Sequence, residues 1–141
     1  MINRRQFLQI GISASAVSLL PVQAMVSAGS LPAWPRVYRI LQDARFPASA
    51  SLARSLQGMF DGKPASMVTL EGDITRFWRQ DLSRAWQQSP QPIAGVTGAS
   101  VLFCLEQLAR DHRLRVQWQQ EVATTSNEPA EPLVAWVIAP A

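Results

Sequence analysis

Two spacings of apolar residues alternate along residues 36–141. Short runs of branched and aromatic residues predict strands, because such side chains favour an extended backbone. Longer stretches repeat apolar residues every three or four positions, which predicts helices that bury one face. The expected order is strand, helix, strand, helix, strand, helix and two strands, over 36–41, 49–57, 66–70, 74–87, 93–96, a helix after Ser100, 114–122 and 133–138.

The stretch 92–116 has the clearest boundaries, and the other segments can be arranged around it. It contains a short apolar strand, a glycine-containing turn at 97–100, an amphipathic helix and the start of another strand. Ser100 is expected to cap this helix, and Asp73 or Thr75 is expected to cap the helix before it. Oxygen atoms of such side chains accept hydrogen bonds from the free N–H groups at a helix start.

Strands that alternate with helices imply right-handed crossovers and a mainly parallel sheet. Apolar and polar residues alternate in Val116-Gln-Trp-Gln119, so the fourth strand is expected to bury one face and to pair antiparallel with the last strand. We therefore expect an α/β fold. It would be a small three-layer β-α-β-α-β-α-β-β domain over 36–141, mainly parallel, with an antiparallel C-terminal edge strand.

Composition limits the classes of partner and cofactor. The formal charge is +3, but leaving out Arg4 and Arg5 reduces the thirteen basic residues to eleven, against ten acidic ones. A nearly neutral domain lacks the electrostatic attraction that nucleic-acid binding requires, so no nucleic acid is expected as a partner. One cysteine cannot form an internal disulfide, and one cysteine with one histidine cannot build a structural zinc site. No metal and no cofactor is predicted.

The first residues contain an export motif. Residues 3–9 read Asn-Arg-Arg-Gln-Phe-Leu-Gln, so that Arg4 and Arg5 precede a polar residue, Phe7 and Leu8. This arrangement resembles the twin-arginine (Tat) signal peptide. It departs from that family at its first position, where Ser or Thr is usual, and at its last, where Lys is usual.

The segment that follows also fits a signal peptide. The apolar stretch 10–20 is interrupted by glycine and serine, and it is too short for a stable membrane span. Small residues offer cleavage after Ala24 or after Ala28. We expect a twin-arginine signal peptide over 1–28 and a proline-rich connector over 29–35.

The resemblance implies export to the periplasm by the Tat machinery, which carries proteins that are already folded. Passengers of that route often bind a cofactor or travel with a partner protein. Two alternatives remain for the leader. It can be a general secretory signal that contains two arginines, or it can stay uncleaved and tether the protein to a membrane.

Three turns are expected to meet at one edge of the sheet, because ligands of open parallel sheets bind beyond the carboxyl ends of the strands. They carry Asp43 with Arg45, Asp73 with Thr75, and Thr97 with Gly98 and Ser100. Arg45, Thr97, Gly98 and Ser100 would bind an anion, since bare N–H groups and the helix dipole favour negative charge. The competing interpretation is a tight turn followed by a helix cap.

The titratable candidates have structural alternatives as well. Asp43 and Asp73 would act as acid and base or hold a divalent cation. The alternative makes Asp73 a helix cap and pairs Asp43 with Arg45. Cys104 is expected to be a small buried apolar residue, and His112 is explained by the dipole at the C-terminal end of a helix.

Two functions follow from these observations. The leading hypothesis is an exported accessory, interaction or ligand-binding protein beside a larger redox enzyme, with Trp34 of the connector as a partner anchor. The alternative is a small hydrolase or transferase acting on an anionic substrate held by Arg45. An open cleft lined by Asp43, Arg45, Asp73 and Thr97 would favour the enzyme. An Arg45 tied into ion pairs under a closed surface would favour the accessory protein.

Overall fold

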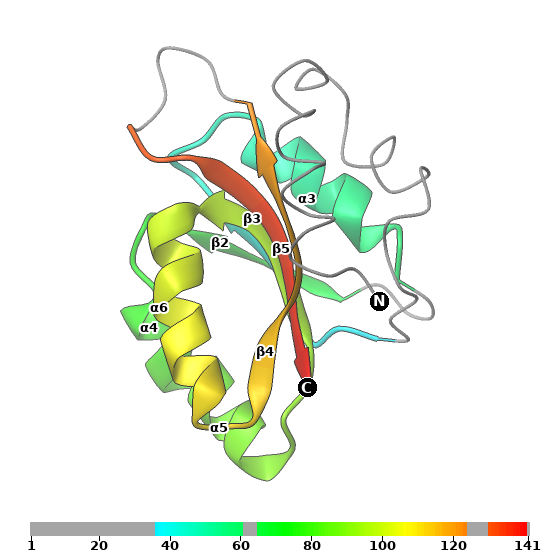
Figure 1. Cartoon of the computed structure of the whole chain (residues 1–141), viewed down its shortest axis with the longest axis vertical. Helices are drawn as coiled ribbons and strands as arrows, with labels where there is room; N and C mark the ends of the chain where they lie inside the picture. Colours follow the sequence, from blue (N-terminus) through cyan, green and yellow to red (C-terminus); the bar gives the residue numbers. More distant parts are fainter. Residues whose placement is uncertain (1–35, 61–64, 124–129, 141) are drawn as a thin grey trace.

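The computed structural model describes residues 36–60, 65–123 and 130–140. They form an α/β fold around one five-stranded mixed sheet with the strand order β2-β1-β3-β5-β4 (Figure 1). The strands are β1 (Arg39–Asp43), β2 (Ser66–Leu70), β3 (Ile93–Gly98), β4 (Leu114–Val122) and β5 (Leu133–Pro140). The expected signal peptide and connector, with Arg4, Arg5, Phe7, Leu8 and Trp34, lie outside the described residues.

Four strands run in one direction and β5 runs against them. β1 pairs in parallel with β2 and β3, whereas β5 pairs antiparallel with both β3 and β4. The expected mainly parallel sheet and the β4–β5 hairpin are therefore confirmed. The expected position of the last strand is wrong, because β5 lies between β3 and β4 and the edge strand is β4. The burial of both strands explains this order: β5 is buried continuously from Leu133 to Ala139, while β4 alternates with exposed positions.

Helices cover both faces of the sheet (Figure 1). Helix α3 (Ser49–Gln57) packs on one face, and its Leu52 and Leu56 join β-strand residues in one apolar core. The other face carries α4 (Thr75–Phe77), the π-helical turn η2 (Trp78–Leu82), α5 (Ser83–Gln88) and α6 (Ala99–Arg110). None of the helices in the described ranges is long and apolar enough to cross a membrane.

The expected helix over 74–87 contains a π turn that its apolar spacing did not predict. The N–H of Ser83 donates to the carbonyl of Trp78, five residues earlier. This wider turn lets Phe77 and Leu82 both point into the core although they are five residues apart. It also directs Asp81, which lies within the turn, to the side chains of Tyr38 and Arg39 at the start of β1.

The junction between β3 and α6 differs from the expected turn. β3 continues past Val96 to Gly98, and α6 begins at the next residue with Gly98 in the N-cap position. Ser100 is therefore not the cap, and the prediction of a turn over 97–100 is wrong. The physical reason is the neighbouring β5, whose residues pair with Thr97 and Gly98 and hold them in the sheet.

Candidate functional site

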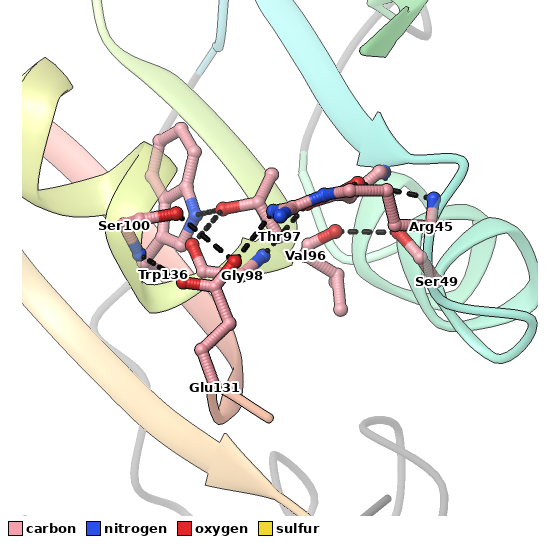
Figure 2. A network of polar contacts seen from close by, with 9 residues as sticks. Arg45, Ser49, Val96, Thr97, Gly98, Ser100, Glu131 and Trp136 are labelled. Atoms are coloured by element: carbon pink, nitrogen blue, oxygen red, sulfur yellow. Dashed lines mark hydrogen bonds and ion pairs between the residues drawn. The ribbon is translucent and has the colours of Figure 1, made fainter. Parts of the chain in front are cut away.

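The candidate site lies at the C-terminal ends of β1 and β3. Helix α3 joins β1 to β2 across one face of the sheet, and the α4–η2–α5 segment joins β2 to β3 across the other. The neighbouring strands β1 and β3 lead into helices on opposite faces, β1 into α3 and β3 into α6. Ligands of open α/β sheets bind at such a point. Asp43 ends β1 and Gly98 ends β3 at this point, and Figure 2 shows the polar network around them.

Asp43 is the buried centre of the network, with a fully buried side chain. It accepts hydrogen bonds from the Arg45 N–H at 3.1 Å, Nε at 3.0 Å and Nη2 at 2.8 Å, and from the Gly98 N–H at 3.0 Å. Burial by itself raises the pKa of Asp43, but the hydrogen bonds from Arg45 and Gly98 outweigh it and hold the pKa below its ordinary value. The carboxylate is therefore charged at neutral pH, and both of its oxygens accept hydrogen bonds from the chain.

Arg45 bridges two carboxylates. Its Nη2 lies 2.8 Å from Asp43 Oδ2 and 2.6 Å from Glu131 Oε1, and 31% of its side chain is exposed. The hydrogen bond to Asp43, which has the largest effect, and the contact with Glu131 raise the pKa of the guanidinium further above its ordinary value. Two glycines make room for the side chain, since a Cβ would approach Arg45 to 2.7 Å from either Gly72 or Gly98.

The carboxylate of Glu131 lies at the N-terminal end of α6. Its carboxylate accepts from the Ser100 N–H at 2.9 Å and from the Ser100 hydroxyl at 3.0 Å, while the Ala99 N–H donates to the carbonyl of Pro132 at 2.9 Å. Burial raises the pKa of Glu131, but the bonds from Ser100 and Arg45 outweigh it, so the pKa lies below its ordinary value. The anion position that the sequence predicted at this helix start is thus filled by a carboxylate of the chain itself.

A second set of hydrogen bonds fixes the strands beneath the charges. The Asp43 N–H donates to Ser49 Oγ at 2.8 Å, and that hydroxyl donates to the Val96 carbonyl at 2.5 Å. Trp136 Nε1 donates to Thr97 Oγ1 at 3.0 Å (Figure 2). Among the described residues, every buried side-chain nitrogen and oxygen has a partner. The Thr97 hydroxyl, which was expected to face a ligand, is fully buried beneath the network.

The structure brings together most, but not all, of the predicted site residues. Asp43, Arg45, Gly98 and Ser100 belong to one network, with Thr97 buried beside it. Asp73 does not join them. Its exposed carboxylate accepts from the Thr75 N–H at 2.8 Å and from the Thr75 hydroxyl at 2.6 Å, which lowers its pKa. Asp73 therefore binds the first N–H of α4 from the position before the N-cap residue, Ile74, which is close to, but not the same as, the cap that the sequence offered as the alternative.

Glu131 and Trp136 were missed by the sequence analysis. Glu131 lies two residues before β5 and Trp136 lies within it, and both are far in sequence from Asp43. The signal that would have found them is the unbroken apolar run of 133–138, which is typical of a strand with neighbours on both sides. Such a strand beside β3 brings its first residues to the start of α6.

Cys104 and His112 do not form a site together. Cys104 is exposed, so its expected burial is wrong. Helix α6 buries Leu102 and Leu105, and Cys104 lies about 200° around the helix from Leu102, away from the sheet. His112 instead contacts two tryptophans, with ring centroids 5.9 Å from Trp78 and 5.6 Å from Trp86. The described residues contain no cluster of three or more metal-ligating side chains.

No protein-family model, no curated protein and no solved structure matches this chain. The function is therefore inferred from the geometry of the network and from the sequence.

Proposed function

We propose that this protein is an exported accessory or interaction protein without catalytic activity, built on a small three-layer α/β scaffold and acting beside a larger periplasmic enzyme. The observation that carries the proposal is the mutual pairing of all charged groups at the candidate site. Asp43 accepts four hydrogen bonds and Arg45 contacts two carboxylates. Each charged group of this network is thus already paired with an opposite charge of the chain itself.

The direction of the pKa shifts supports the same conclusion. A general acid or base works best when its pKa lies near the operating pH, so a carboxylate in either of these two roles at neutral pH needs a raised pKa. The pKa values of Asp43 and Glu131 are both lowered. Carboxylates of this kind stabilise a fold through ion pairs and do not exchange protons with a substrate at neutral pH.

Export and the periplasmic partner rest on the leader. Arg4, Arg5, Phe7 and Leu8 match the twin-arginine motif, whose passengers fold before they cross the membrane. The association with a redox enzyme is proposed because passengers of the twin-arginine route often bind a cofactor or travel with a partner protein. Trp34 in the connector remains the candidate partner anchor.

One observation favours the alternative of a hydrolase or transferase with an anionic substrate. Arg45 keeps 31% of its side chain exposed at the point of the sheet where ligands bind. An anion would reach it by displacing Glu131 from Arg45 and Ser100. This alternative predicts turnover of small phosphate or carboxylate esters that is lost in Arg45→Ala.

The decisive experiment is a pull-down of the tagged full chain from its native periplasm, followed by mass spectrometry. We expect a stoichiometric companion enzyme, and weaker recovery of that enzyme with Trp34→Ala. A leader variant with Arg4→Lys and Arg5→Lys is the matched control for the route. It should leave the protein in the cytoplasm and abolish recovery of the companion. Recovery of the protein alone from the periplasm would contradict the accessory function.

A further inference from the structure

The sheet has two edges of opposite character. The β4 edge is protected in ways that prevent pairing with another chain. Arg115 and Glu121 are exposed charges on this strand, and a bulge interrupts its pairing with β5 between Val116 and Trp118. The Gln117 amide within the bulge donates to the Pro140 carbonyl at 3.0 Å.

The β2 edge has none of these features. Its sequence, Ser-Met-Val-Thr-Leu over Ser66–Leu70, contains no charge and no proline. All five residues pair with β1 in an unbroken parallel register, and β1 is its only neighbour among the described strands. An uncharged, regular edge strand leaves a row of backbone donors and acceptors available to another strand.

The apolar side chains at this edge are also incompletely covered. Met67 packs against the core under α3 and Val68 against the core on the opposite face, and both are only half-buried. Met59 and Ala65 beside them are half-buried too. At the β4 edge, by contrast, apolar residues are closed off: Leu114, Trp118 and Val122 are 0%, 4% and 6% exposed. On β4 only Val116 is a half-buried apolar residue, whereas on β2 both Met67 and Val68 are, so the apolar surface at the β2 edge is covered less completely.

We infer that the β2 edge binds the β2 edge of a second copy of this chain, antiparallel across a two-fold axis, so that two sheets become one. Val68 is the middle residue of β2, and an axis at Val68 pairs Ser66 with Leu70 and Met67 with Thr69. No charge then faces a like charge within the ladder. A two-fold contact of one surface with itself also closes and does not propagate into a fibre.

The charges that flank the strand select this orientation. Arg36 is exposed at the N-terminal end of the β1–β2 pair, where Arg39 is already paired with Asp81, and Glu71 and Asp73 follow the C-terminal end of the pair. An antiparallel arrangement brings the basic end of one copy to the acidic end of the other. A parallel arrangement would bring like charges together, which disfavours it.

Light scattering during gel filtration of the full chain tests the inference. The unaltered protein should have twice the monomer mass of 15.6 kDa. Val68→Lys places two ammonium groups across the axis, and Thr69→Lys adds a charge at an already exposed position, so both should halve the mass while circular dichroism stays unchanged. Glu121→Lys on the β4 edge is the matched control and should remain a dimer.

Cross-linking tests the register. In a Cys104→Ala background, Val68→Cys should form a disulfide-linked dimer with mild oxidant, because residues opposite each other have Cβ atoms about 4.5–5.5 Å apart. Thr69→Cys, which would face Met67, should cross-link far less. A monomer at every concentration, a dimer that survives both lysine variants, or stronger cross-linking of Thr69→Cys would each overturn the inference. These outcomes do not depend on whether a companion enzyme is found, because the contact involves this chain alone.

Discussion

Two arginine–carboxylate clusters stand at opposite ends of β1, and they differ in burial more than in geometry. At the start of the strand, Arg39 Nε lies 3.1 Å from Asp81 Oδ2, and the two side chains are each 27% exposed. Beyond its end, Arg45 Nη2 lies 2.8 Å from Asp43 Oδ2, and the aspartate side chain is fully buried. Only the second carboxylate also accepts a backbone N–H from another strand, that of Gly98.

The comparison shows what an ion pair at each end of the strand contributes. A pair near the surface contributes about 0–1 kcal/mol, because water screens both charges. A buried carboxylate cannot lose its partners so easily, and breaking such a pair costs about 3–5 kcal/mol. The Asp43 cluster is therefore expected to hold β1, β3 and α6 together, whereas the Asp81 cluster fixes the π turn against one strand.

The largest expected effect is that of Asp43→Ala. We expect it to lower the free energy of unfolding by about 3 kcal/mol, near the low end for a broken buried pair, because Arg45 keeps Glu131. Asp81→Ala removes a carboxylate from the other arginine and should cost about 1 kcal/mol or less. Urea denaturation of both variants measures the difference. Equal losses would contradict the distinction between the two ends of β1.

Gly98→Ala should disturb the buried cluster without removing a charge. A Cβ at Gly98 would overlap Glu131 Oε1 and lie 2.7 Å from Arg45 Nη2, so the ion pair must move. Overpacking of this kind costs roughly 1–3 kcal/mol, and we expect about 2. Gly58→Ala is the control, since the nearest atom to its Cβ would be 3.6 Å away. Thermal melting should show a lower melting temperature for Gly98→Ala and not for Gly58→Ala.

Local pattern was enough to predict several elements and one ion pair. The bounds of α3, β2 and β4 agree with the expected ranges, because apolar spacing marks all three and nearby glycines also mark α3 and β2 in the sequence. Asp43 pairs with Arg45, two residues away, as the structural alternative expected. A contact between residues so close in sequence does not depend on the order of the strands in the sheet.

Contacts that depend on strand order could not be predicted in this way. Glu131 reaches Arg45 because β5 inserts beside β3, and a hydrophobic pattern does not encode which strands are neighbours. The Thr97 hydroxyl was expected to face a ligand, but it accepts from Trp136 on the same inserted strand. The π turn was missed because one extra residue in a helix changes the apolar spacing very little.

The acid sensitivity of the fold should depend on Glu131. The pKa values of Asp43 and Glu131 are lowered in the folded protein, so their contribution is present above the ordinary carboxylate pKa of about 4 and is lost as pH falls through the lowered values. Glu131→Gln should cost about 1.5 kcal/mol at neutral pH and flatten the loss of stability in acid. Glu121→Gln, an exposed carboxylate on β4, is the control and should leave the curve unchanged. Identical acid profiles for both variants would refute the role of Glu131.

The smallest effect is expected at the other end of β1, in the titration of Tyr38. The hydrogen bond that its hydroxyl donates to Asp81 raises the pKa of this phenol, and burial raises it further. A raised pKa stabilises the fold below the unfolded value of about 10 and loses that contribution as pH rises through the folded value. Asp81→Asn should therefore lower the pKa of Tyr38 while changing stability by less than about 1 kcal/mol. Ultraviolet absorbance of the phenolate measures this pKa directly, since the chain contains a single tyrosine. An unchanged titration in Asp81→Asn would mean that the carboxylate does not hold the phenol, and Arg39 alone would then tie Asp81 of the π turn to β1.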